Sequence, residues 1–104
     1  MVMTILEARV EPERWAALRE SYDTRADLPK AGPIVESFLV QSAEDERTWR
    51  IVTVWRDREA LEAMRGSGET PTGVLIFRDA DAEPGLTIFN VWANPRAASA
   101  DTGT

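Results

Sequence analysis

The chain has 104 residues, 43% hydrophobic and 29% charged, which is typical of one soluble globular domain and not of a disordered chain. Its 18 acidic and 12 basic residues give a formal net charge of -6, which opposes binding to nucleic-acid phosphates or anionic lipid. The sequence contains neither cysteine nor histidine, which excludes disulfides, thiolate nucleophiles, histidine metal ligands and a Ser-His-Asp triad. Because no signal pattern or membrane-length apolar run occurs, we expect a cytoplasmic protein with neither nucleic acid nor membrane as partner.

Residues 2–10 predict a first strand in which apolar side chains occur at both sets of alternating positions. Both faces of this strand are therefore expected to be covered. A helix should follow, because Pro12 and Glu13 suit a first turn and Trp15, Leu18 and Tyr22 recur at spacings of three and four. Residues 28–33 contain two prolines and a glycine, which predicts a connecting loop.

Residues 34–42 and 48–55 predict two further strands. The segment between them, residues 43–47, is short and acidic, so the two strands should form an antiparallel hairpin with an exposed loop. The alternating positions of the second strand are Ile34, Glu36, Phe38 and Val40 on one face, and Val35, Ser37, Leu39 and Gln41 on the other.

The chain changes from strand to helix chemistry at Asp57. The residues before it are β-branched and aromatic, and those after it are strong helix formers. The Asp57 carboxylate suits the N-cap, Glu59 suits the first turn, and Arg65 followed by Gly66 suits the end of the helix.

Residues 70–78 permit two interpretations. Thr70 and Pro71 favour the start of a short helix, whereas Gly73 and the branched residues after it also suit a strand. We expect an irregular helix. Residues 86–92 predict the last strand, and the small, polar residues 94–104 predict a disordered tail, which leaves a domain of residues 1–93.

This order of elements predicts an α+β fold of the ferredoxin-like split βαβ type, with a four-stranded antiparallel sheet and helices on one face. The other face of the sheet would also be apolar, and a monomer would expose it to water. We therefore expect a homodimer in which two copies pack these faces together. Trp15, Trp49 and Trp92 are expected in the core or in the dimer contact.

The run from Val54 to Ala63, with the hairpin before it and the last strand after it, resembles the antibiotic biosynthesis monooxygenase family of dimeric α+β barrels. The resemblance covers residues 2–93. It implies a homodimer with a small-molecule pocket between sheet and helices, and it implies cofactor-independent oxygenation of an aromatic or polyketide-like substrate. The alternatives are a non-catalytic ligand-binding or dimerisation module of the same fold, or a polyketide cyclase or isomerase.

Other members of the family degrade haem, and the resemblance implies which residues they need. The asparagine, tryptophan and histidine of those members align with Ala8, Met64 and Val74. None of the three is retained, and the sequence contains no histidine. Haem degradation is therefore disfavoured, and no cofactor is expected.

Four residues are candidates for the site. Trp55 could stack on a planar substrate or pin the following helix to the sheet, and the Tyr22 hydroxyl could bond a substrate oxygen or reach the surface. Asn90 interrupts an apolar strand and could bind a ligand carbonyl, or it could lie on an edge facing water. Glu36 is the best candidate for a general base, although a solvent-facing position is the simpler interpretation of this residue.

Overall fold

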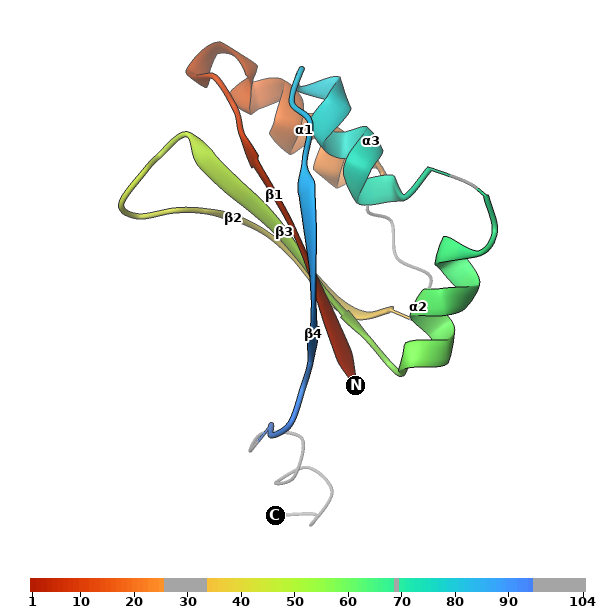
Figure 1. Cartoon of the computed structure of the whole chain (residues 1–104). Helices are drawn as coiled ribbons and strands as arrows, with labels where there is room; N and C mark the ends of the chain where they lie inside the picture. Colours follow the sequence, from red (N-terminus) through yellow and green to blue (C-terminus); the bar gives the residue numbers. More distant parts are fainter. Residues whose placement is uncertain (26–33, 69, 95–104) are drawn as a thin grey trace.

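The computed structural model describes residues 1–25, 34–68 and 70–94. Within them, the four strands form one antiparallel sheet in the order β2-β3-β1-β4, and Figure 1 shows the helices on one side of it. The predicted α+β fold, with a four-stranded antiparallel sheet and helices on one face, is confirmed. The elements are β1 (Val2–Arg9), a short 3-10 helix η1 (Pro12–Arg14), α1 (Trp15–Arg25), β2 (Ile34–Gln41), β3 (Thr48–Trp55), α2 (Arg58–Arg65), α3 (Thr72–Asp79) and β4 (Gly85–Asn90).

The register divides the sheet into a helix face, which the helices cover, and an open face. Strand β1 is central and pairs with β3 from Val2 opposite Trp55 to Arg9 opposite Thr48. Residues directly opposite one another in an antiparallel pair point to the same side. The open face consists of Met3, Ile5, Glu7 and Arg9 of β1, Glu36, Phe38 and Val40 of β2, Thr48, Arg50, Val52 and Val54 of β3, and Gly85, Thr87 and Phe89 of β4.

The predicted hairpin of β2 and β3 is confirmed, but strict alternation along β2 is wrong at its first residue. Ile34 lies opposite Trp55 and Glu36 lies opposite Val54, so β2 contains one extra residue at this point. Such a bulge turns the residue before it to the other side of the sheet. Ile34 therefore lies on the helix face, while Glu36 remains on the open face.

The core on the helix face consists of two clusters. The larger is covered by α1 and α3, and its most deeply buried members are Leu18 and Phe77, both 0% exposed. At its edge the rings of Trp15 and Trp49 meet at an interplanar angle of 63° with centroids 5.8 Å apart. The smaller cluster is covered by α2 and consists of Val2, Trp55 and Leu61.

Helix α2 begins and ends where the sequence predicts. The Asp57 carboxylate accepts a hydrogen bond of 2.8 Å from the Ala60 amide, and this bond lowers the pKa of Asp57. At the other end the Gly66 amide donates to the Glu62 carbonyl at 2.8 Å. The helix is short, and Leu61, which is 1% exposed, is its one fully buried residue, so this side chain holds it to the sheet.

The expected helix over residues 70–78 is confirmed as α3, and Gly73 has a packing role in it. A Cβ atom at this position would lie 2.5 Å from Cδ1 of Leu6, so any larger residue would require the end of the Leu6 side chain to move. The glycine therefore allows α3 to lie close to β1.

The predicted loop over residues 28–33 and the tail after residue 94 lie outside the described residues. None of the helices in the described ranges combines the length and the apolar character that crossing a bilayer requires.

The contact between α1 and α3 predicts a pH dependence of stability. Arg25 Nε and Ser21 Oγ of α1 donate to the Asp79 carboxylate of α3 at 2.7 and 2.6 Å, and these bonds, that of Arg25 first, lower the pKa of Asp79. A carboxyl group with a lowered pKa in the folded state stabilises the fold above its ordinary pKa of 3.8. This contribution is lost as the pH falls through the folded-state pKa. We expect Asp79→Asn to lower the thermal unfolding midpoint at neutral pH, and we expect the difference from wild type to shrink as the pH falls below 3.8.

The matched control is Asp23→Asn, which removes the same charge but breaks only an exposed pair with Arg19 of the same helix. It should lower the midpoint at neutral pH by less than Asp79→Asn does, because exposed ion pairs contribute little. The midpoints can be measured by circular dichroism over a series of pH values. A loss in Asp79→Asn that is the same at every pH would contradict the assignment.

Candidate functional site

A cavity of about 320 Å³ lies between the helix face of the sheet and the helices α1, α2 and α3. This volume lies at the lower end of the range found for small-molecule pockets. The cavity is lined by Thr4, Leu6, Tyr22, Arg25, Ile34, Ser37, Ile51, Thr53, Trp55, Leu61, Met64, Arg65, Pro71, Thr72, Gly73, Val74, Ile76, Pro84 and Leu86.

Most of the cavity wall is apolar. Leu6 and Ile51 contribute from the two central strands, Leu61 and Met64 from α2, and Ile76 from α3. The cavity exists because α2 covers one end of the helix face while α1 and α3 cover the other (Figure 1). An apolar wall of this kind favours the hydrocarbon part of a ligand, since its transfer from water is favourable.

Two hydrogen-bonded pairs fix the polar groups of the cavity. The Trp55 Nε1–H donates to Thr4 Oγ1 at 3.0 Å, and both side chains are buried, with Trp55 5% and Thr4 7% exposed. The Tyr22 hydroxyl donates to Ser37 Oγ at 3.1 Å. Because a hydroxyl can accept and donate at the same time, Thr4 and Ser37 keep the capacity to donate to a ligand oxygen.

The charged groups of the cavity are two arginines at helix ends. Arg25 is the last residue of α1 and Arg65 is the last residue of α2. Among the residues that the structure describes, no Asp or Glu lines the cavity. Within the same residues, no group of three acidic side chains is placed to hold a metal ion.

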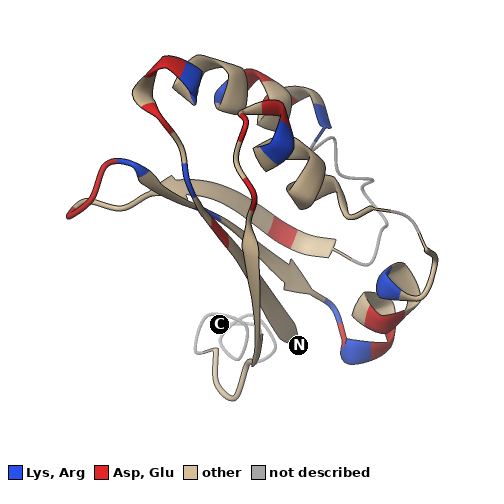
Figure 2. Cartoon of the chain, turned by 45° about the horizontal axis from the view of Figure 1, so that its top comes forward, with Lys and Arg blue, Asp and Glu red and all other residues tan. Residues whose placement is uncertain are grey.

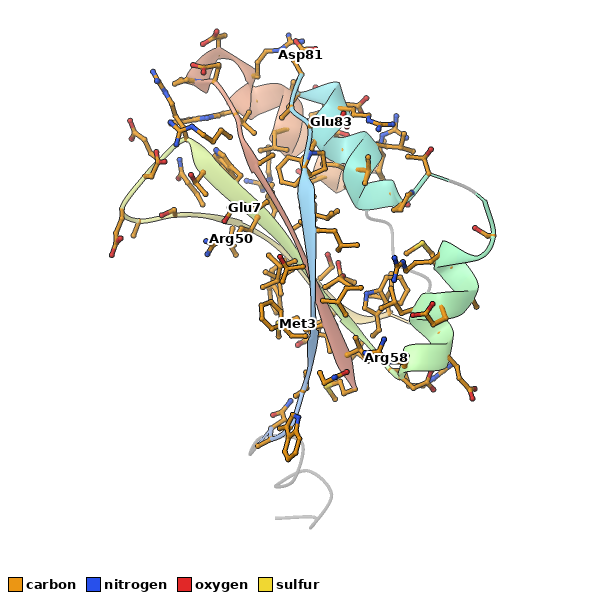
Figure 3. The ribbon with its side chains drawn as sticks, viewed as in Figure 1. Met3, Glu7, Arg50, Arg58, Asp81 and Glu83 are labelled. Carbon is orange, nitrogen blue, oxygen red and sulfur yellow. The ribbon has the colours of Figure 1, made fainter. Side chains whose placement is uncertain are left out.

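The structure brings two of the four predicted site residues together. Trp55 and Tyr22 both line the cavity. Glu36 lies on the open face, opposite Val54, and is exposed. Asn90 is exposed at the end of β4, where its Oδ1 accepts a hydrogen bond of 2.9 Å from Nη2 of Arg58, which is labelled in Figure 3.

Sequence reasoning missed several residues of the cavity. Thr4, Ser37 and Thr53 are hydroxyl residues on the strand faces that point to the helices, and a polar residue on a predicted buried face is the signal that could have identified them. Arg25 and Arg65 carry no comparable signal, because a cation in the last turn of a helix is ordinary.

The positions that align with haem-degrading residues also lie at or near the site. Met64 and Val74 line the cavity, so this part of its wall is apolar. Ala8 is 6% exposed and belongs to the larger core cluster instead.

Solved structures with the same fold come from several organisms. A protein from Deinococcus radiodurans is 14% identical with a TM-score of 0.67, and the match covers 90% of this chain and 95% of that one. SnoaB from Streptomyces nogalater, a cofactor-independent oxygenase, is 13% identical with a TM-score of 0.59, covering 89% and 94%. MhuD from Mycobacterium tuberculosis, a haem degrader with two haems bound in its active site, is 19% identical with a TM-score of 0.66, covering 90% and 98%. At these identities the likeness shows the fold.

A comparison with curated proteins finds no match to the sequence. The sequence model of one family, described as antibiotic biosynthesis monooxygenase, matches residues 1–70. The match spans more than half of the chain and includes the β1, β2 and β3 strands and the α2 helix, which bound the cavity. The chain therefore belongs to the antibiotic biosynthesis monooxygenase family.

Proposed function

We propose that the protein binds a small planar aromatic molecule in this cavity and oxygenates it without a cofactor. The observation that carries the proposal is the position of Trp55, whose indole is held by Thr4 in the wall of an otherwise apolar cavity. A fixed indole offers a flat surface on which an aromatic ring can stack. SnoaB, which shares the fold, is described as a cofactor-independent oxygenase.

The chemistry fits a substrate that is acidic enough to lose a proton to water and that then reacts with dioxygen as the anion, such as a phenolic anthrone. Its methylene carbon is oxidised to a ketone while dioxygen is reduced: one oxygen atom enters the product, and the other leaves as water with the two methylene hydrogens. The electrons come from the substrate anion. The protein has to orient the ring and keep water away from the reacting carbon, which Trp55 and the apolar wall can do.

The second candidate is a ligand-binding protein of the same fold that does not catalyse a reaction. One observation favours it: within the described residues the cavity is lined by no carboxylate, and the whole sequence contains no histidine. The most common general bases are therefore missing from its wall. The same observation disfavours a polyketide cyclase or isomerase that depends on an Asp, Glu or His side chain as its general base.

The open face of the sheet supports a homodimer as the functional unit. Phe38, Val40 and Phe89 are 46%, 41% and 48% exposed on this face. Figure 2 shows that the charged residues gather on the helices and the hairpin loop, whereas few lie on the strands. The open face carries four charged residues, Glu7, Arg9, Glu36 and Arg50, of which Glu7 and Arg50 form a cross-strand ion pair of 2.6 Å and lie side by side in Figure 3. Because this pair is internally neutralised, a second copy can cover it at a reduced electrostatic cost.

Oxygen consumption tests the reaction. With the anthrone dithranol we expect uptake of one O₂ per substrate oxidised and, from ¹⁸O₂, one labelled atom in the product, both above the rate without protein. Trp55→Phe removes the hydrogen bond to Thr4 and should lower the rate by about tenfold or more through misplacement of the ring. Trp49→Phe is the matched control, since Trp49 lies outside the cavity and its Nε1 has no partner within the described structure.

If no aromatic substrate is consumed but naphthalene-sized ligands bind, the non-catalytic candidate is correct. If Trp55→Phe and Trp49→Phe have equal rates, Trp55 does not contribute to the reaction.

Sedimentation velocity tests the dimer. Phe38→Glu places a charge within the proposed contact, on the edge strand β2, and should convert a dimer at micromolar concentration to a monomer, because a buried unpaired carboxylate is strongly unfavourable. Ala16→Glu adds the same charge at an exposed position on α1 and should leave the dimer intact. A wild-type protein that sediments as a monomer, or a Phe38→Glu variant that remains a dimer, would contradict the proposed contact.

A further inference from the structure

Within the described part of the chain, the charged side chains that line the cavity are opposite in sign to the net charge of the protein. The chain carries 18 acidic and 12 basic residues and a net charge of -6. Among the described residues, however, the charged side chains that line the cavity are Arg25 and Arg65 alone. A cavity with low-dielectric walls and one sign of charge concentrates its field on whatever enters it.

Arg25 is fixed by Asp79 and still has N–H groups that can donate to another acceptor. Its Nε–H donates to the Asp79 carboxylate at 2.7 Å, and Asp79 is itself fixed by a bond of 2.6 Å from Ser21. A guanidinium group has five N–H donors in a planar fork, and the bond to Asp79 uses one of them. Arg25 can therefore keep this bond and donate to a second oxygen acceptor.

Arg65 is the less neutralised of the two arginines. Within the described ranges, the carboxylate oxygen that approaches it belongs to Glu62 and lies 3.9 Å from Nη1, which is longer than a hydrogen bond. Glu62 is also shared, because Arg58 approaches the same oxygen to 3.6 Å. Arg65 thus lines the cavity with much of its guanidinium charge unmatched.

We propose that the ligand of this cavity is an aromatic acid, whose carboxylate is bound by Arg65 with Arg25 while its ring system lies against Trp55 and the apolar wall. The proposal rests on the proposed binding function and names its substrate class. Arginine matches a carboxylate with two parallel N–H donors, a geometry that a neutral amide or alcohol does not satisfy. The cavity thus selects an anionic ligand in a protein whose overall charge repels one.

Two ligands of equal size distinguish binding of an aromatic acid from binding of any small aromatic molecule. 2-Naphthoate has the ring and the carboxylate, and 2-naphthamide has the same ring with a neutral group. Titration calorimetry of the full chain at low ionic strength should give a dissociation constant at least about tenfold lower for 2-naphthoate, since hydrogen bonds to charged groups are worth more than neutral ones. Added salt should weaken the binding of 2-naphthoate and leave that of 2-naphthamide nearly constant.

Two variants of α2 then test the contact. Arg65→Gln should weaken 2-naphthoate about tenfold and change 2-naphthamide by less than about twofold. Arg58→Gln removes the same charge from the same helix, but Arg58 does not line the cavity, so the binding of 2-naphthoate should change little. Both positions are exposed, and circular dichroism can verify that the variants fold.

Each outcome decides between the proposals. If both ligands bind equally, the anion preference is overturned and the small-molecule function stands. If Arg65→Gln and Arg58→Gln weaken 2-naphthoate equally, the effect is one of net charge, and the direct contact of Arg65 is overturned. If neither ligand binds, the proposed function falls together with this inference.

Discussion

The buried hydrogen bond between the Trp55 indole and the Thr4 hydroxyl joins the architecture of this protein to its cavity. It crosses the two central strands at the point where β3 ends and the turn into α2 begins. Trp55 packs on Leu61, the residue that holds α2 to the sheet, and it also lines the cavity. If the indole moved, Thr4 would keep a buried hydroxyl without this partner, at a cost of about 1–3 kcal/mol, and the helix would lose its main contact. The position of α2 and the shape of the cavity therefore depend on one pair.

The two faces of the sheet carry different roles. On the helix face, α2 is separated from α1 and α3, and the cavity lies between them. No helix in the described part of the chain covers the open face, and its phenylalanines remain about half exposed. A second copy is the simplest cover for such a surface, because apolar area removed from water contributes about 25 cal/mol per Å². A dimer formed in this way would leave the cavity of each subunit accessible, since the two lie on opposite sides of the sheet.

The fold could be predicted from the sequence because each helix and strand has a local sequence pattern that indicates its type. Alternation predicted the strands, the N-cap at Asp57 predicted α2, and Pro71 predicted the start of α3. The bulge before Glu36 could not be predicted, because one extra residue in a strand does not change the alternation that surrounds it. It affects only Ile34, which it turns toward the cavity.

The site was less predictable, because it depends on how distant elements pack. Trp55 and Tyr22 lie on faces that periodicity identifies as buried, and both reach the cavity. Glu36 and Asn90 are predicted site residues because each is a polar residue that interrupts an apolar strand, but Glu36 lies on the open face and Asn90 accepts a hydrogen bond from Arg58. The two cavity arginines are ordinary helix-end cations in the sequence. Only the packing of α1 and α2 over neighbouring parts of the helix face brings them to one cavity.

If the cavity between the sheet and the helices is the ligand site, the signals of the tryptophan side chains should report a ligand bound there. The four tryptophans give four indole N–H signals in a ¹⁵N correlation spectrum, and they report on different parts of the molecule. On titration with 2-naphthoate, we expect the Trp55 signal to shift most, while the signals of Trp49 and Trp92, which do not line the cavity, stay nearly constant. Shifts concentrated in the amides of Phe38 and Phe89, with Trp55 unchanged, would place the ligand on the open face and contradict the account.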